Sequence, residues 1–173
     1  MQFVVAPLAH NTRQSPDPTM LTPEVHTAME RSVLCWLATV NAAGQPNVSP
    51  KEVFAPFDAE HVVIANIASP TSVRNLLSNP CVCVSFIDVF VQKGFKIIGT
   101  AQNIARHAPD YAHWVRPLQA KAGTRFTIHS VMVVKVQSIE AILAPSYRLY
   151  PQKTTEQSQI ESAMRTYGVR PAS

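Results

Sequence analysis

Three short apolar stretches follow one another along the chain, with only short polar turns between them. VLCWLATV covers 33–40, PNVSPKEVF covers 46–54 and HVVIANI covers 61–67. Their β-branched and aromatic residues are typical of strands, and Gly44 fits the positive-φ position of the first turn. Connections this short leave no room for crossover helices. The three strands are therefore predicted to be antiparallel neighbours in a meander.

Three more stretches with the residue pattern of strands follow, at 81–91, 95–105 and 126–143. Helical patterns are inserted among the strands without alternating with them, at 21–32, 70–78, 109–123 and 154–167. Six strands with mostly short connections are typical of an antiparallel barrel. The predicted fold class is therefore mainly β, of the α+β type: a six-stranded antiparallel barrel with short helices.

Local signals predict where several helices begin and end. Thr22 is the expected N-cap of the first helix, because Pro23 then takes the first helical position. Pro117 predicts a kink or a break in the third helix. In the last helix, Thr154 and Gln157 have capping-box spacing. Gly168 fits the left-handed position just after that helix.

The chain has 173 residues and no break in composition, which predicts a single domain over 1–173. Within it we expect an N-terminal arm at 1–20, the barrel at 22–143 and a C-terminal helix within 151–168. Apolar residues make up 46% and charged residues 15% of the chain, which is typical of a globular protein rather than a disordered one.

Charge and cysteine content argue against several classes of partner. The formal net charge is +4, but no run of five basic residues occurs, so we expect no nucleic-acid partner. No apolar run approaches the ~20 residues of a membrane span, so we expect no membrane partner. Cys35, Cys81 and Cys83 form no zinc-type pattern with histidine. They predict reduced structural thiols in a cytoplasmic protein without a metal site.

The stretch NIASPTSVRNLLSNP, at 66–80, lies between two predicted strands. Val73, Leu76 and Leu77 recur at the spacing of a short amphipathic helix, so we expect these three side chains to face inward. The Asn-Pro pair at 79–80 ends the helix, because the residue before a proline disfavours the helical conformation.

Small hydroxyls gather where this short helix begins. Ser69 fits the N-cap, Thr71 and Ser72 fall in the first turn, and Arg74 follows closely. Free amides, the positive end of the helix dipole and hydroxyls together form an anion site, typically for phosphate, to which an arginine can pair. The alternative is an ordinary Ser-Pro helix cap, and both interpretations are open at this point.

The second predicted strand carries an unusual polar face. Asn47, Ser49 and Lys51 alternate, so their side chains lie on the same side of the strand. A face with an amide, a hydroxyl and an ammonium group is a suitable floor for a polar cofactor. A solvent-facing edge strand would show the same pattern.

The order of these stretches resembles the FMN-binding split-barrel family related to pyridoxamine 5′-phosphate oxidase. The resemblance lies in LATVNAAGQPNVSPK, HVVIANIASPTSVRNLLSNPCVCVSF and FKIIGTAQ, and it covers about residues 22–143. It implies a homodimer of six-stranded split barrels, with FMN in a groove at the dimer interface. The FMN phosphate would lie at the start of the short helix, and the flavin ring along the second strand.

The resemblance also implies which residues hold the cofactor, when it is carried over position by position. The residues expected to border the flavin ring are Ser49, Pro50, Lys51, Asn66 and Ile67. The residues expected around the phosphate are Ser69, Thr71, Ser72 and Arg74. Lys93 would reach the cofactor from the partner subunit.

Some positions depart from the pattern of the true oxidases. Pro70, Thr71 and Ser72 stand where those enzymes carry a Ser-Arg-Lys run, Phe54 replaces a basic residue, and their C-terminal substrate motif is absent. The resemblance therefore implies a flavin-dependent oxidoreductase that acts on another small molecule, with NAD(P)H as a possible donor. No residue stands out as catalytic. The alternatives are a non-catalytic flavin- or haem-binding module and a deazaflavin-dependent reductase on the same fold.

Overall fold

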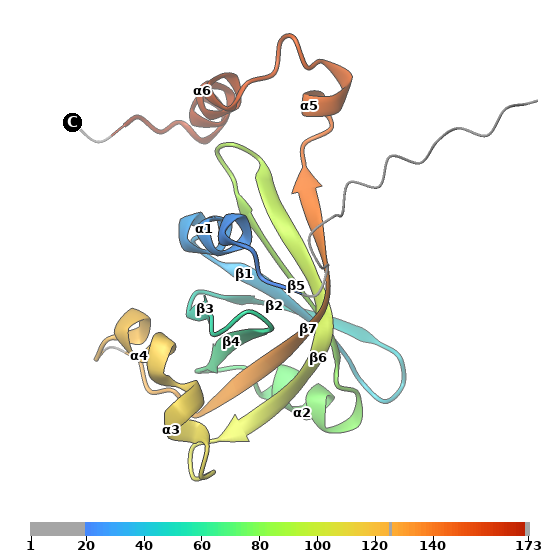
Figure 1. The fold of residues 1–173 in the computed structure, drawn as a ribbon, viewed down its shortest axis with the longest axis vertical. Helices are drawn as coiled ribbons and strands as arrows, with labels where there is room; N and C mark the ends of the chain where they lie inside the picture. Colours follow the sequence, from blue (N-terminus) through green and yellow to red (C-terminus); the bar gives the residue numbers. More distant parts are fainter. Residues whose placement is uncertain (1–19, 125, 172–173) are drawn as a thin grey trace, which may run out of the picture.

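The computed structural model describes residues 20–124 and 126–171, so the predicted arm at 1–20 lies almost entirely outside the described residues. Seven antiparallel strands form a sheet that curls into a half barrel (Figure 1). The strands are β1 (Cys35–Val40), β2 (Pro46–Lys51), β3 (Phe54–Pro56), β4 (His61–Asn66), β5 (Cys81–Asp88), β6 (Lys93–Ala105) and β7 (Ser130–Leu143). Their order across the sheet is β2-β1-β5-β6-β7-β4-β3. The predicted mainly β split-barrel fold is confirmed.

The strand count is seven rather than six, because the predicted second strand, 46–54, is divided. Its first part, β2, pairs with β1, whereas its last residue, Phe54, begins β3, which pairs with β4. The two parts lie at opposite edges of the curled sheet. The predicted meander is therefore wrong beyond the first hairpin: β4 pairs with β3 and β7 and does not pair with β2.

The β5–β6 hairpin also starts its turn earlier than predicted. β5 ends at Asp88 because the Asp88 Oδ1 atom accepts hydrogen bonds from the amides of Phe90 and Val91, at 3.0 and 3.4 Å. Gln92 then takes a left-handed conformation with φ 56°, and β6 begins at Lys93. The turn is thus closed by a side chain, which a strand pattern in the sequence does not show.

The helices are α1 (Pro23–Arg31), α2 (Pro70–Ser78), α3 (Tyr111–Trp114), α4 (Arg116–Ala122), α5 (Ser146–Leu149) and α6 (Glu156–Tyr167). The Thr22 cap and the break near Pro117 are confirmed. The predicted cap of the last helix is wrong by one residue. Thr154 bonds the carbonyl oxygen of Ser146 instead, and Thr155 forms the capping box with Ser158. Gly168 takes the left-handed position, as predicted.

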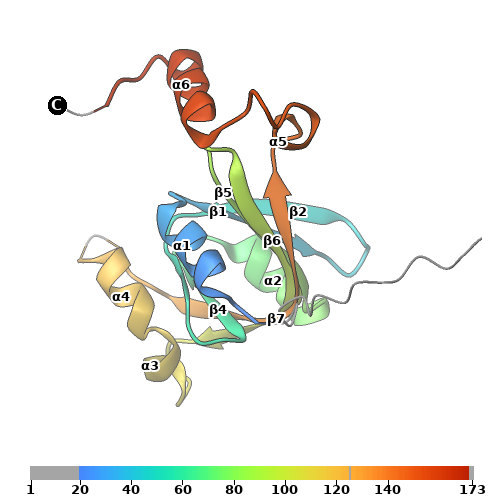
Figure 2. The same ribbon diagram turned by 45° about the horizontal axis from the view of Figure 1, so that its top comes forward.

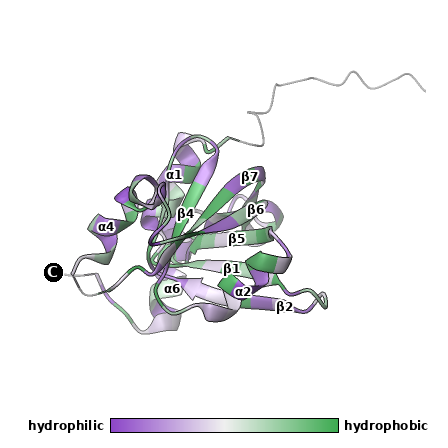
Figure 3. Ribbon diagram, turned by 90° about the horizontal axis from the view of Figure 1, so that it is seen from below, coloured by the Kyte–Doolittle hydropathy of each residue, from purple (hydrophilic) through white to green (hydrophobic). Residues whose placement is uncertain are grey.

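Apolar side chains pack on both faces of the sheet. In Figure 3, green apolar positions recur along the strands. On one face, Ile64, Phe86 and Met132 pack against Val25 and Met29 of α1. On the other face, side chains of β3, β4 and β7 pack under α3 and α4. Figure 2 shows α1 and α4 beside the sheet and α6 beyond one end of it. Within the described residues, no helix is both long and apolar enough to cross a bilayer.

Candidate functional site

The start of α2 meets the polar face of β2 at a buried lysine. Lys51 is only 5% exposed. Its Nζ donates a hydrogen bond to the Oγ atom of Ser49, at 2.6 Å, and another to the Oγ atom of Ser69. Ser69 takes the predicted N-cap position, but its side chain accepts no bond from a helix amide. The structure thus brings the strand face and the hydroxyl-rich helix start together.

Asn66, the last residue of β4, connects this cluster to the sheet. Its Oδ1 atom accepts the Ser69 amide at 3.1 Å, and its Nδ2 group donates to the Ser130 Oγ atom at 2.8 Å. Both ends of the amide are therefore engaged. The two bonds hold the start of α2 against the end of β4 and the start of β7.

A second polar group lies beneath α2. Thr39 is fully buried, and its Oγ1 atom accepts bonds from Asn75 Nδ2, at 3.0 Å, and from Asn47 Nδ2, at 3.3 Å. Asn47 Nδ2 also lies 3.5 Å from the Oγ atom of Ser72, which is 1% exposed. Buried polar groups of this kind fix one orientation when their hydrogen bonds are satisfied. This group sets how α2 is rotated about its axis.

The orientation of α2 shows that the predicted apolar stripe is wrong at Leu77. The helix buries Ser72, Asn75 and Leu76, whereas Leu77 is 83% exposed. Sequence reasoning missed Thr39 and Asn75 as parts of the site. Two signals point to them: Thr39 lies on the inward-facing positions of β1, and Asn75 comes one turn after Ser72 on the same helix face.

A groove of about 450 Å³ opens beside Lys51, where β2 ends and α2 begins. Half of the ten predicted site residues line it: Ser49, Pro50, Lys51, Ile67 and Ser69. Apolar side chains, among them Val53 and Phe126, form the rest of the wall, and Glu52 contributes a carboxylate. The groove is therefore amphipathic, with its polar end at the start of the helix.

The structure does not bring the remaining predicted residues into this groove. Asn66 and Ser72 lie behind it, in the hydrogen bonds that hold α2. Thr71 and Arg74 are exposed, one turn apart on the outer side of α2. Lys93 lies in the β5–β6 hairpin and forms an ion pair with Glu156 at 2.8 Å. Its contact with a cofactor from a partner subunit stays a prediction.

Among the described residues, no carboxylate lies within ion-pair distance of the Lys51 ammonium group. Burial lowers the pKa of Lys51, and Cys35, which faces it across the β1–β2 pair, opposes that shift more weakly. Burial raises the pKa of the Cys35 thiol to about 12, so this side chain is neutral. In the described part of the chain, Lys51 forms no ion pair; its bonds go to hydroxyls. A buried cation of this kind is stabilised when an anion binds beside it.

Comparisons with known proteins agree with this fold. The sequence matches the family model of pyridoxamine 5′-phosphate oxidase over residues 21–144. HupZ from Group A Streptococcus is 24% identical, with a TM-score of 0.59, over 69% of this chain and 92% of that chain. An FMN-binding protein from Syntrophomonas wolfei is 12% identical, with a TM-score of 0.61, over 72% and 87% of the two chains.

HutZ, a haem storage protein from Vibrio cholerae, is 22% identical, with a TM-score of 0.53, over 72% of this chain and 94% of that chain. No curated protein matches the sequence. The structural similarities establish the shared fold, and the family model covers most of the chain. This chain belongs to the pyridoxamine 5′-phosphate oxidase family.

Proposed function

We propose that this protein binds FMN in the groove beside Lys51 and acts as a flavin-dependent oxidoreductase. The observation that carries the proposal is the buried ammonium group of Lys51, which Ser49 and Ser69 hold at the start of α2 and which forms no ion pair with any described residue. Family membership and the similarity to an FMN-binding protein support the same cofactor.

The residues of the groove fit the two ends of FMN. The phosphate would be held by the Lys51 ammonium group and the hydroxyls of Ser49 and Ser69. Val53, Ile67 and Phe126 offer an apolar wall that suits a flat ring.

The chain's own part in the reaction is binding, orientation and the exclusion of water. Bound FMN would supply the redox chemistry, accepting electrons from a donor such as NAD(P)H and passing them to a small molecule. Among the described residues that line the groove there is no His, Cys or Tyr. We assign to the side chains there the position and electrostatics of the flavin.

We place the protein in the cytoplasm as a homodimer with the cofactor site at the interface. The outer face of β1 and β2 supports this assembly, because α3 and α4 cover the other half of the sheet only. On the uncovered half, Trp36 is 44% and Val48 58% exposed. Apolar surface of this kind is typical of a contact between subunits. The three free cysteines agree with a reducing compartment.

The Val48→Arg variant tests the assembly, because an arginine on this face would have to be buried unpaired in the dimer. We expect the wild type to be dimeric and Val48→Arg to be largely monomeric in light scattering after size-exclusion chromatography, with weaker FMN binding. Val89→Arg is the matched control at another exposed valine, in the β5–β6 hairpin. A monomeric wild type, or an unaffected Val48→Arg dimer, would contradict the proposed interface.

The cofactor is tested by the absorption spectrum of the purified protein, before and after incubation with excess FMN and removal of the unbound fraction. We expect retained flavin at one FMN per chain, and oxidation of NADH or NADPH by the loaded protein. Flavin without turnover would indicate a binding module. A haem Soret band or a deazaflavin spectrum would replace FMN by that cofactor, and a protein that keeps no chromophore would overturn the proposal.

A further inference from the structure

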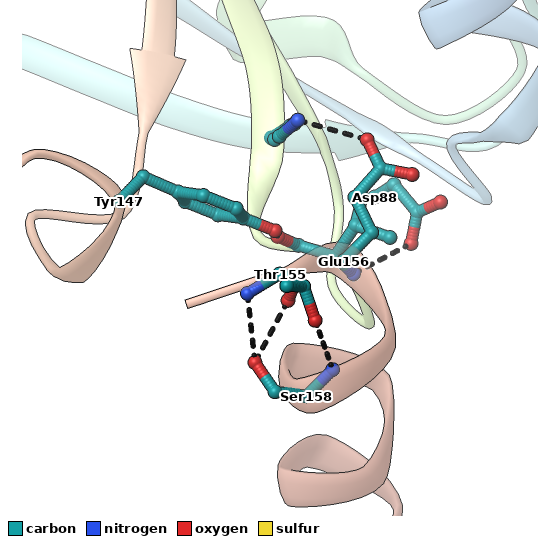
Figure 4. Close-up of polar contacts among 7 residues, drawn as sticks. Asp88, Tyr147, Thr155, Glu156 and Ser158 are labelled. Atoms are coloured by element: carbon teal, nitrogen blue, oxygen red, sulfur yellow. Dashed lines mark hydrogen bonds and ion pairs between the residues drawn. The ribbon is translucent and has the colours of Figure 1, made fainter. Parts of the chain in front are cut away.

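The six lysines of this chain differ in how their side-chain nitrogens are held. Lys93 and Lys96 form ion pairs at 2.8 Å with Glu156 and Glu140, and the hydrogen bonds of these pairs raise the pKa of both lysines. Figure 4 shows Glu156 at the start of α6, with the capping residue Thr155 beside it. A protonated amine is not a nucleophile, so these two lysines are unreactive near neutral pH.

Lys51 differs from the other lysines in its surroundings. Lys121 donates to the carbonyl oxygen of Phe54 at 2.9 Å, and Lys135 and Lys153 are exposed to water, which stabilises their charged form. Lys51 is buried and contacts only two hydroxyls. Burial lowers its pKa, because water cannot stabilise the charge. At a given pH, a larger fraction of Lys51 is therefore the neutral amine, which is the nucleophilic form.

The contacts of Lys51 suit a neutral amine as well as an ammonium group. A neutral amine has two N–H groups, and the Oγ atoms of Ser49 and Ser69 accept one hydrogen bond each. The remaining position on the nitrogen is then a lone pair, at the wall of the groove that Lys51 lines. Each serine also keeps its own hydroxyl proton, for which no described residue is an acceptor. A nucleophile and two proton donors thus lie together.

We propose that Lys51 forms a reversible imine with a small apolar aldehyde when the groove holds no FMN. The Lys51 nitrogen bonds to the carbonyl carbon, and one amine proton passes to the carbonyl oxygen, to which a serine hydroxyl donates. That oxygen then leaves as water with the second amine proton, and the C=N bond forms. The apolar body of the aldehyde lies on Val53 and Ile67. Hydrolysis reverses the reaction and restores the amine.

The imine would regulate the loading of the cofactor. FMN and the aldehyde compete for the same groove of about 450 Å³, and the neutral imine no longer offers an ammonium group to the phosphate. An aldehyde bound to Lys51 would therefore keep the groove free of FMN until hydrolysis releases it. This effect on FMN rests on the proposed function, whereas the formation of the imine does not.

Benzaldehyde with cyanoborohydride tests the imine in the FMN-free, full-length protein near neutral pH, because the hydride reduces an imine to a stable secondary amine. Peptide mapping by mass spectrometry locates each benzyl group and separates the lysines from the α-amino group, which also reacts near neutral pH. At limiting benzaldehyde, we expect severalfold more label on Lys51 than on the exposed Lys153. In the protein unfolded by urea, the two lysines should be labelled alike.

Excess FMN should protect Lys51 and leave the labelling of Lys153 unchanged, and the protein benzylated at Lys51 should lose FMN binding. Label on Lys51 that FMN does not reduce would support the imine and contradict the placement of the FMN phosphate. FMN binding by a protein in which Lys51 is labelled no faster than Lys153 would overturn the imine and leave the cofactor proposal intact. The same preference in urea would also overturn the imine proposal, because the fold would then play no part.

Discussion

Replacing Lys51 by methionine is expected to weaken FMN binding about 100-fold, because the phosphate loses its buried cation. Charge-assisted hydrogen bonds contribute about 1.5–3 kcal/mol each, and 2.7 kcal/mol corresponds to about two orders of magnitude in Kd. Titration of the apoprotein with FMN, followed by quenching of flavin fluorescence, measures the change. Lys153→Met is the matched control at an exposed lysine and should bind like the wild type. Unchanged affinity in Lys51→Met would rule out this groove as the phosphate site.

The same substitution should make the ligand-free protein more stable, by about 1 kcal/mol near neutral pH, because it removes a buried charge without a counter-charge. Burial lowers the folded-state pKa of Lys51 below its ordinary value of 10.5. The unfolded chain therefore binds this proton more tightly, and the wild type gains stability as pH rises from the lowered value towards 10.5. Urea unfolding at several pH values in that range should show this rise of the unfolding free energy in the wild type and no such rise in Lys51→Met.

Gly94→Ala is expected to cost about 3 kcal/mol of unfolding free energy, the upper end of what overpacking usually costs. A Cβ atom on Gly94 would lie 2.0 Å from the carbonyl oxygen of Phe86 and 2.7 Å from the Cα atom of Ile87. Both are backbone atoms of β5, and Gly94 pairs directly with Ile87. The strand cannot move away without losing ladder hydrogen bonds. Equilibrium urea denaturation measures the loss.

Gly44→Ala separates this steric effect from backbone strain. Gly44 has φ +78°, but a Cβ atom there would meet nothing within 4 Å. We expect a cost of about 1 kcal/mol, from the left-handed conformation alone. If Gly94→Ala cost no more than Gly44→Ala, the close approach of β5 to β6 would not limit stability.

Local elements of the fold were predictable from sequence, whereas the pairing of distant strands was not. Thr22 and Pro23 start α1, and Gly44 closes the β1–β2 turn, because these preferences depend on neighbouring residues only. The pairing of β4 depends on how far the whole sheet curls. The short turn pattern at 55–60 favoured a meander, whereas the chain passes from one edge of the sheet to the other at 52–53, within the predicted second strand.

In the candidate site too, local features were predictable from sequence, whereas contacts between distant residues were not. The alternation of Ser49 and Lys51 predicted their shared strand face, and the family resemblance implied that this face lies beside the helix start at Ser69, as the structure shows. Arg74 was assigned to the anion from its distance along the chain. Its actual direction depends on the rotation of α2, which the bond between Asn75 and Thr39 sets. The inward position of Thr39 and the helix face of Asn75 mark both as candidate buried polar residues, but neither position shows in sequence that the two are partners.

The separation of β2 and β3 has a consequence for the order of assembly. Residues 52–53 join the two strands, which form opposite edges of the sheet. The groove therefore lies along the seam of the half barrel, where the chain passes from one edge strand to the other. The seam is complete only when β2 has joined β1 and β3 has joined β4. A molecule bound there would stabilise only chains in which both edges have formed. Ligand binding would then act as a closing step of folding, and its energy would oppose the fraying of the two edge strands.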